Sequence, residues 1–123
     1  MNEQAMKDRT KRFGIRVIRL VESLSRGRAA EVIGRQLIRS ATSVGANYRS
    51  ACRAKSRADF VAKLAIVEEE ADESGYWLEL LIEAGLVKAA LLGPLLKEAN
   101  EIVAIIVASI KTSRRALRKS TAL

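Results

Sequence analysis

A chain of 123 residues is long enough for one domain with a hydrophobic core and too short for two. Leu, Ile, Val and Ala supply most of its apolar residues, with one proline, one cysteine and no histidine, so the composition favours a helical bundle and excludes an intrachain disulfide. The net charge of +8 is unevenly distributed: residues 1–58 and 102–123 are basic and residues 59–101 are acidic, which predicts internal ion pairs and an anionic partner.

Apolar residues recur at helical spacing in four segments, which predicts an all-α protein, a single antiparallel up-down-up-down four-helix bundle over residues 1–123. The first helix is expected at about residues 3–24 and the second at about residues 28–53. The inner face of the second helix is expected to consist of Val32, Leu37, Ala41, Val44, Tyr48 and Ala51. Gly45 lies in the middle of this helix at a cost of about 1 kcal/mol, so we expect another backbone to pass close to it and to Ser40, Ala41 and Ala46.

Ser56 is a good N-cap for the third helix, and Asp59 three residues later completes a capping arrangement. This helix is expected at about residues 57–84, and Gly85 is expected to end it in the left-handed conformation that glycine adopts readily. Proline is tolerated best in the first turn of a helix. The fourth helix is therefore expected at about residues 94–117, beginning at Pro94, after a separate helical turn at residues 88–92.

Polar residues on the second and third helices are expected to fix the registry of the bundle. Asn47 is expected to hydrogen-bond with Ser40 or Glu70. Five arginines share one stripe of the second helix and are expected to pair with the acids of the third: Arg28, Arg35, Arg39, Arg49 and Arg53. Solvated pairs of this kind add only about 0.2–1 kcal/mol each, so they set registry more than stability.

The third and fourth helices carry more apolar surface than a lone bundle buries. A second apolar stripe runs beside the first on the fourth helix, and Trp77 and Leu80 lie away from the main apolar face of the third. We therefore expect a homo-oligomer whose interface includes Trp77, Leu80, Val103 and Val107. A monomer with a wide core face is the alternative that the pattern leaves open.

Three stretches of the second and third helices carry a family resemblance: SATSVGAN at residues 40–47, KSRADF at residues 55–60 and EEEADESGYWLELL at residues 68–81. Over about residues 37–81 the chain resembles the four-helix bundle family that includes the proteins encoded in intervening sequences of bacterial 23S rRNA genes. The accessory variability determinant proteins of diversity-generating retroelements are similar. Many relatives carry an acidic residue where this chain has Ser50, beside Arg49.

The resemblance implies a homopentamer. For the retroelement branch it also implies a basic protein that binds nucleic acid and engages a reverse transcriptase.

The residues themselves offer no recognisable catalytic or metal site. Carboxylates recur at helical spacing on the third helix, but metal sites of this kind in bundles normally add histidines, and the chain has none. Cys52 and the serines likewise lack a histidine to act as base. We therefore expect a protein that is not an enzyme and holds no cofactor and no metal.

Arginines gather on one stripe of the first helix and near the end of the fourth. The expected nucleic-acid contacts are Arg9, Arg12, Arg16, Arg19, Arg114, Arg115 and Arg118. We expect the two groups at opposite ends of the bundle, where they would contact phosphates rather than bases, because aromatic residues for stacking are few. A solvated basic face is the alternative reading.

Together these observations predict a non-enzymatic basic scaffold that binds RNA or DNA, accessory to a reverse transcriptase or to RNA processing. A structural protein–protein adaptor with no nucleic-acid role is the alternative from a different class. The lone cysteine, the absence of an apolar leader and the absence of any run near the ~20 apolar residues of a membrane span predict a cytoplasmic protein without a membrane partner.

Overall fold

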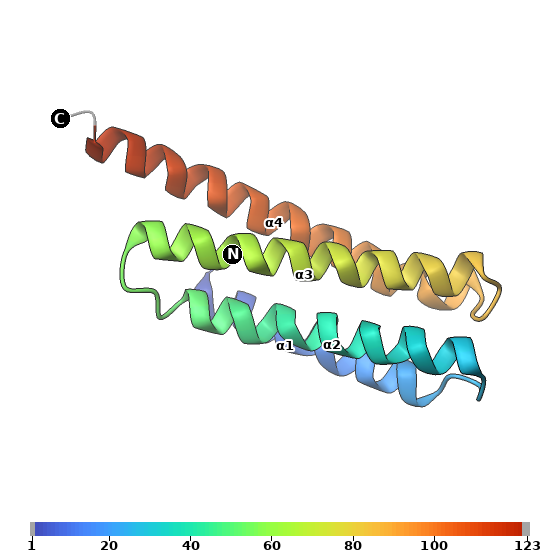
Figure 1. Ribbon diagram of the computed structural model, residues 1–123. Helices are drawn as coiled ribbons and strands as arrows, with labels where there is room; N and C mark the ends of the chain where they lie inside the picture. Colours follow the sequence, from blue (N-terminus) through green and yellow to red (C-terminus); the bar gives the residue numbers. More distant parts are fainter. Residues whose placement is uncertain (1, 122–123) are drawn as a thin grey trace.

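The computed structural model describes residues 2–121 and contains four α-helices (Figure 1). They are α1 (Glu3–Glu22), α2 (Arg28–Ala51), α3 (Arg57–Glu83) and α4 (Ala89–Thr121). Short connections at residues 23–27, 52–56 and 84–88 oblige successive helices to run antiparallel. The predicted all-α four-helix bundle is confirmed, and the described residues contain no strand. Among α1 to α4 there is no segment with the length and hydrophobicity of a membrane span.

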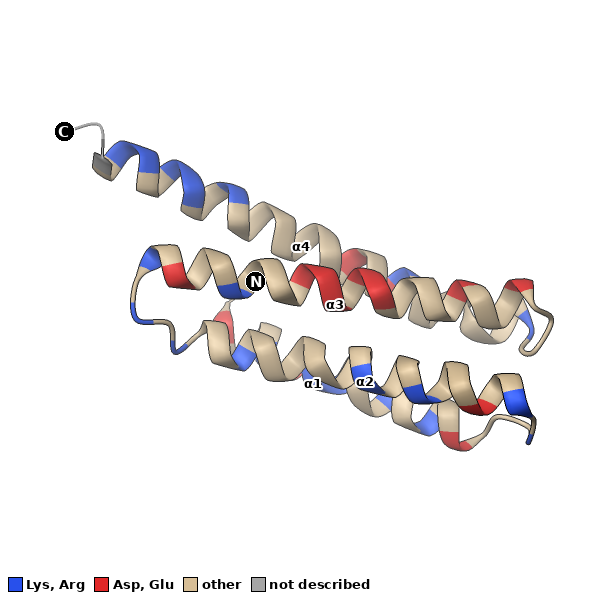
Figure 2. Ribbon diagram, viewed as in Figure 1, with Lys and Arg blue, Asp and Glu red and all other residues tan. Residues whose placement is uncertain are grey.

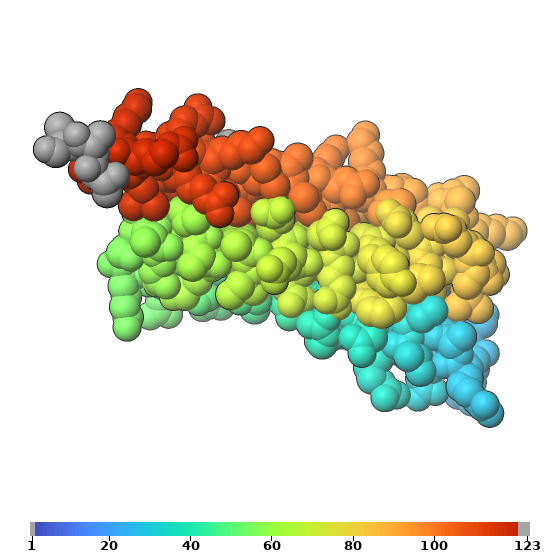
Figure 3. Space-filling view, turned by 45° about the horizontal axis from the view of Figure 1, so that its top comes forward, coloured from blue at the N-terminus to red at the C-terminus, as the bar shows by residue number. Residues whose placement is uncertain are grey.

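The bundle is closed on three sides and more open on the fourth. Consecutive helices pack against one another, while α1 and α4 have the smallest contact of any packed pair. Figure 3 shows α4 lying along α3, and Figure 1 shows α4 diverging from α1 toward its C-terminal end. The surface between α1 and α4 is therefore the place where the two helices expose the sides that a closed bundle would cover.

Local hydrogen bonds explain where α3 begins and ends. The Ser56 hydroxyl accepts the N–H of Asp59 at 3.1 Å, and the Asp59 carboxylate accepts the N–H of Lys55 at 3.1 Å, a reciprocal cap of the kind expected. At the other end Gly85 has φ of +73°. Its N–H donates to Ile82, and the N–H of Leu86 donates to Leu81, each at 3.0 Å, so the last carbonyl groups of the helix are satisfied.

The start of α4 differs from the sequence prediction. The helix begins at Ala89 and runs through Pro94, instead of beginning at Pro94 after a separate turn. Pro94 has no N–H to donate to the Ala90 carbonyl, but only this one bond of the helix is lost so close to its start. The N–H groups of Leu91 and Leu92 bond to the Lys88 carbonyl at 3.0 and 3.4 Å and hold the first turn. α4 also continues beyond Leu117, to Thr121.

The core runs the length of the bundle and uses one stripe of each helix. Its largest fully buried side chains include Phe13, Leu37, Leu64, Leu78 and Ile102. The expected inner face of α2 is buried except for Val32, which is 57% exposed. Val32 precedes Leu37 by five residues, and five helical steps of 100° turn it away from the core. Ala30 is buried in its place.

The α1 and α2 backbones approach closely at Gly45. A Cβ added there would lie 3.4 Å from the carbonyl carbon and oxygen of Thr10 and from the nitrogen of Lys11. Thr10 is itself buried, and its hydroxyl donates to the Met6 carbonyl at 2.9 Å. The small residue therefore lets α1 lie directly on α2, and a larger side chain would push the two helices apart.

Candidate nucleic-acid interface

The basic segments of the chain meet at one end of the bundle, contrary to the expectation that they lie at opposite ends. In an up-down-up-down order, α1 begins, α2 ends, α3 begins and α4 ends on the same side (Figure 1). We call residues 3–12, 49–63 and 111–119 the basic end. They contain fourteen Lys or Arg and three Asp or Glu, whereas the rest of the chain contains eight and eleven (Figure 2). The basic end thus carries a net charge of +11 and the remainder −3.

Arg9, one of the expected nucleic-acid contacts, is engaged inside the molecule. Its Nε lies 2.7 Å from Oε2 of Glu98, and its Nη2 lies 2.8 Å from Oε1 of Glu98 and 2.6 Å from Oε2 of Glu101. The Arg9 side chain is 20% exposed and that of Glu98 16%. The hydrogen bonds from Arg9 hold the pKa of Glu98 below its ordinary value. Arg9 therefore joins α1 to α4, and its positive charge is neutralised by carboxylates of the protein instead of being available to a ligand.

The other arginines of the α1 stripe stand around this ion pair. Arg12 and Arg19 are exposed, and Arg16 is half-buried. Arg9, Arg12 and Arg16 line a shallow cavity together with two carboxylates, Asp8 and Glu98. Part of the positive charge on this stripe is therefore compensated within the protein.

The arginines near the end of α4 lie where the helix diverges from α1. Arg114, Arg115 and Arg118 are exposed, and Lys111 and Lys119 are exposed beside them. This segment of α4 contains no acidic residue. It is the more basic of the two groups that the sequence singled out.

A third group of cations, which the sequence interpretation did not assign to a ligand, surrounds the connection between α2 and α3. Arg49 and Arg53 were expected to pair with acids of α3, and instead they line a cavity with Lys63. The register explains the difference: Arg39 lies opposite Glu70 and Glu73, so antiparallel packing places residues ten positions later on α2 opposite the start of α3. That start carries Lys63 and Arg57 rather than the acidic cluster. The sequence therefore contained the signal.

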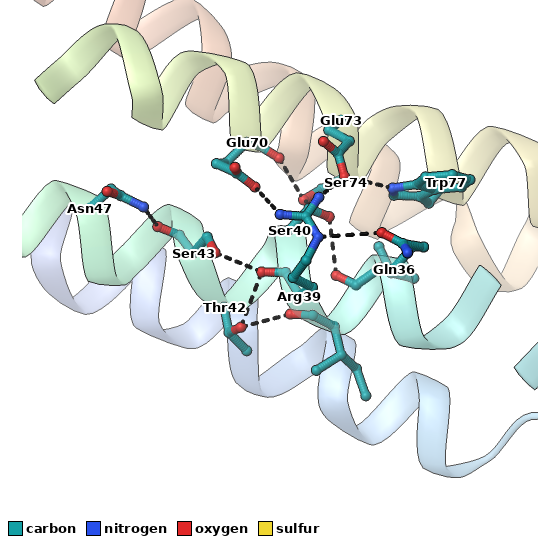
Figure 4. Close-up of polar contacts among 12 residues, drawn as sticks. Gln36, Arg39, Ser40, Thr42, Ser43, Asn47, Glu70, Glu73, Ser74 and Trp77 are labelled. Atoms are coloured by element: carbon teal, nitrogen blue, oxygen red, sulfur yellow. Dashed lines mark hydrogen bonds and ion pairs between the residues drawn. The ribbon is translucent and has the colours of Figure 1, made fainter. Parts of the chain in front are cut away.

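Only Arg39 of the five stripe arginines forms the expected pairing with α3. Its guanidinium contacts the Glu70 carboxylate at 3.3 Å and also that of Glu73, which accepts the Trp77 indole N–H at 3.0 Å (Figure 4). The hydrogen bond from Trp77 is the main cause that lowers the pKa of Glu73, and the contact with Arg39 lowers it further. Arg35 pairs with Glu31 on its own helix. Arg28, like Arg49 and Arg53, forms no ion pair within the described residues.

The polar contact inside the bundle involves Ser40 but not Asn47. The hydroxyls of Ser40 and Ser74 lie 3.0 Å apart and both are buried, so they link α2 to α3 (Figure 4). The Asn47 amide instead donates to the Ser43 carbonyl of its own helix at 2.8 Å. The expected bond from Asn47 to Ser40 or Glu70 is wrong, because the amide donates within α2 instead.

The residues expected at an oligomer interface are half-buried. Trp77, Leu80, Val103 and Val107 are neither in the core nor fully exposed. Tyr76 is 54% exposed and meets the Trp77 ring edge to face, with ring centres 5.1 Å apart. These positions keep apolar surface that a partner could cover, and the oligomer stays a prediction.

The groups that could serve catalysis or metal binding are the carboxylates, Cys52 and Tyr48. Among residues 2–121, no three of the Cys, Asp and Glu side chains are arranged to hold a metal ion. Cys52 is half-buried, and burial raises the pKa of its thiol, which disfavours the nucleophilic thiolate at neutral pH. Burial likewise raises the pKa of Tyr48. These groups fit a structural role.

Fold and charge together define a class, a four-helix bundle with one strongly basic end. Over residues 2–108 the chain matches the family described as 23S rRNA-intervening sequence proteins, and it belongs to this family. It is similar to a protein of the S23 ribosomal protein family from Bacteroides thetaiotaomicron, whose crystal structure gives a TM-score of 0.83 at 37% identity over 90% of this chain and 99% of that one. A comparison with curated proteins found no match. Membership of the retroelement branch stays a prediction.

Proposed function

We propose that this protein is a non-enzymatic basic scaffold that binds nucleic acid through its phosphates. The observation that carries the proposal is the basic end, where a net charge of +11 gathers on a protein whose remainder is acidic. Phosphate contacts by Lys and Arg supply most of the affinity of sequence-independent binding. The family is named after intervening sequences of 23S rRNA, which supports RNA as the first nucleic acid to test.

The absence of an enzymatic role is part of the proposal. A general base at neutral pH is most often histidine, and the chain has none. The thiol of Cys52 has a raised pKa and is half-buried. The protein would then serve as an accessory to another activity, such as reverse transcription or RNA processing.

A salt titration of binding tests this function. Fluorescence anisotropy of a labelled RNA strand, and of DNA of the same sequence, would be followed from about 50 mM to about 200 mM salt, where affinity that rests on phosphate contacts falls linearly on logarithmic axes. The Arg114→Gln, Arg115→Gln double variant should bind more weakly, with a shallower slope. Absence of binding at about 50 mM salt, or affinity that does not depend on salt, would contradict the proposal.

A matched control comes from the opposite end of the bundle. Arg26 and Arg28 are exposed and form no ion pair within the described residues, so changing both to Gln removes the same charge away from the basic end. The control should retain nearly the full affinity. Equal losses in the two double variants would indicate an effect of net charge alone.

The second candidate function, a protein–protein adaptor, is favoured by the aromatic pair on α3. Tyr76 is 54% exposed and lies against Trp77, and aromatic residues of this kind often anchor protein interfaces. An adaptor of this type would retain its partner at high salt and lose it in the Tyr76→Ala variant. Nucleic-acid binding would show the reverse pattern.

A further inference from the structure

An open cavity whose charged lining residues are all basic lies at the C-terminal end of α2, beside the connection to α3. Ala46, Arg49, Ser50, Arg53 and Lys63 line it, and its volume is about 360 Å³. We call it the connection pocket. It differs from the cavity beside the α1 arginines, which contains Asp8 and Glu98 in its lining. An anion entering the connection pocket would therefore meet no carboxylate among the side chains that line it.

The positive charge of the connection pocket is largely uncompensated. Within residues 2–121 neither Arg49 nor Arg53 forms an ion pair. Lys63 has one carboxylate partner, Asp59, at 2.9 Å, and that carboxylate also accepts the Lys55 N–H. The two arginines thus carry the charge that is free to meet a ligand, and a guanidinium can bind two phosphate oxygens at once.

The backbone around the connection pocket is held in place by hydrogen bonds. The N–H of Arg53 donates to Ser50 and that of Ala54 donates to Ala51, each at 3.0 Å, so the chain turns tightly after α2. On the other wall, the capping bonds between Ser56 and Asp59 fix the start of α3. The backbone positions that carry the cations are therefore set before any ligand arrives, which lowers the ordering cost of binding.

A second cavity continues from the connection pocket along the outer surface of α1 and α2. It has a volume of about 500 Å³ and shares Ala46 and Arg49 with the connection pocket. Its lining includes Lys7 and Lys11 of α1. We call this second cavity the groove. Lys7 pairs with Glu3, and Asp8 also lines the groove, so the uncompensated positive charge is concentrated where Arg49 joins the two cavities. The result is one path of cations over three helices.

We propose that the connection pocket seats a backbone phosphate of a bound nucleic-acid strand, and that the strand continues past Arg49 along the groove toward Lys11. The inference rests on the proposed function, and it assigns a contact that neither the α1 nor the α4 arginines provide. A nucleic-acid strand suits a continuous path of cations because it carries one charge at every nucleotide. The Ser50 hydroxyl, exposed in the pocket, adds a neutral donor to phosphate oxygen.

Paired double variants test the assignment. Arg49→Gln with Arg53→Gln removes the two free cations of the pocket, and Arg26→Gln with Arg28→Gln removes the same charge at the opposite end. The first pair should weaken binding of a labelled single strand about tenfold at about 50 mM salt, and should reduce the slope of log affinity against log salt by about 0.7, as expected for the one phosphate that the pocket seats. The second pair should leave the slope unchanged. Circular dichroism and thermal melting would verify that both variants remain folded.

The outcomes separate this inference from the function on which it rests. Absence of binding by the unaltered protein at about 50 mM salt would overturn both. Normal binding with equal losses in the two double variants, or with no loss in the first, would overturn the connection pocket alone. A polyglutamate peptide that competes as well as an RNA strand of equal charge would overturn the choice of phosphate over carboxylate.

Discussion

At the scale of single residues, the ion pair between Arg9 and Glu98 should contribute measurably to stability. Both side chains are mostly buried, and two hydrogen bonds join them. Glu98→Gln should lower the free energy of unfolding at pH 7 by about 1.5–3 kcal/mol, the range for hydrogen bonds to charged groups. Urea denaturation would measure it. The Glu31→Gln control breaks a pair whose side chains are 71% and 73% exposed, and it should cost under about 1 kcal/mol.

The same ion pair predicts a pH dependence. Arg9 lowers the pKa of Glu98 in the folded protein, so the stabilisation is complete above the ordinary carboxyl pKa and is lost as the pH falls through the lowered value. The difference in stability between the native chain and Glu98→Gln, measured by urea denaturation at pH 7, should therefore diminish when the measurement is repeated at progressively lower pH toward about 3. A difference in stability that persists undiminished in acid would show that the Gln side chain acts by packing and not by charge.

Gly45 should tolerate no large side chain. Leucine there would meet the α1 backbone at Thr10 and Lys11, and overpacking of this kind costs about 1–3 kcal/mol even though leucine favours a helix more than glycine does. Thermal melting of Gly45→Leu, compared with Ala29→Leu at an exposed position of the same helix, would reveal the cost. Equal melting temperatures would mean that α1 can shift away from α2 without loss.

At the scale of helices, the sequence predicted what depends on local chemistry. Ser56, Asp59 and Gly85 mark the ends of α3 correctly because a cap is a contact between near neighbours in the chain. The start of α4 was predicted wrongly at Pro94. The free-energy cost of a proline depends on how many hydrogen bonds of the helix precede it, and the sequence does not show where the helix begins. Asn47 misled because a side chain that can bond within its own helix needs no partner on the next.

Arg49 and Arg53 show a different limit on reading the site from sequence. Their placement on the arginine stripe of α2 was right, but their partners depended on the register between α2 and α3, at which the hydroxyls of Ser40 and Ser74 meet. Arg9 likewise looks exposed by spacing alone. Its carboxylate partners on α4 are 89 and 92 residues away in the sequence, so only the folded bundle shows that it is neutralised.

α4 should become more stable when its proline is removed. Pro94→Ala restores an N–H that can donate to the Ala90 carbonyl, and proline inside a helix costs up to about 3 kcal/mol relative to alanine. We expect the free energy of unfolding to rise by about 1–3 kcal/mol, measured by urea denaturation. An unchanged value would mean that water already satisfies the Ala90 carbonyl at this early position of the helix.

At the scale of the whole molecule, an oligomer would bring several copies of the basic end together. Cyclic symmetry with bundles parallel to the axis would place every copy of the basic end on one face, so that one strand could contact several subunits. The half-buried residues Trp77, Leu80, Val103 and Val107 are the expected apolar surface for such contacts. The family resemblance implies a homopentamer, so we predict a mass five times the 13.5 kDa of the chain, measured by light scattering after size exclusion.

A variant that disrupts the oligomer interface should then also lose affinity for nucleic acid. Val107→Glu places a charge on the expected interface and should give a helical monomer, whereas Ala29→Glu, at an exposed position on α2, should leave the assembly intact. Because contacts to one strand from several subunits multiply, the monomer should bind a long strand at least about a hundredfold more weakly, yet a strand short enough for one subunit about equally. Equal affinity of both forms for the long strand would show that each subunit binds alone, and a monomeric native chain would indicate that α4 simply has a wide core face.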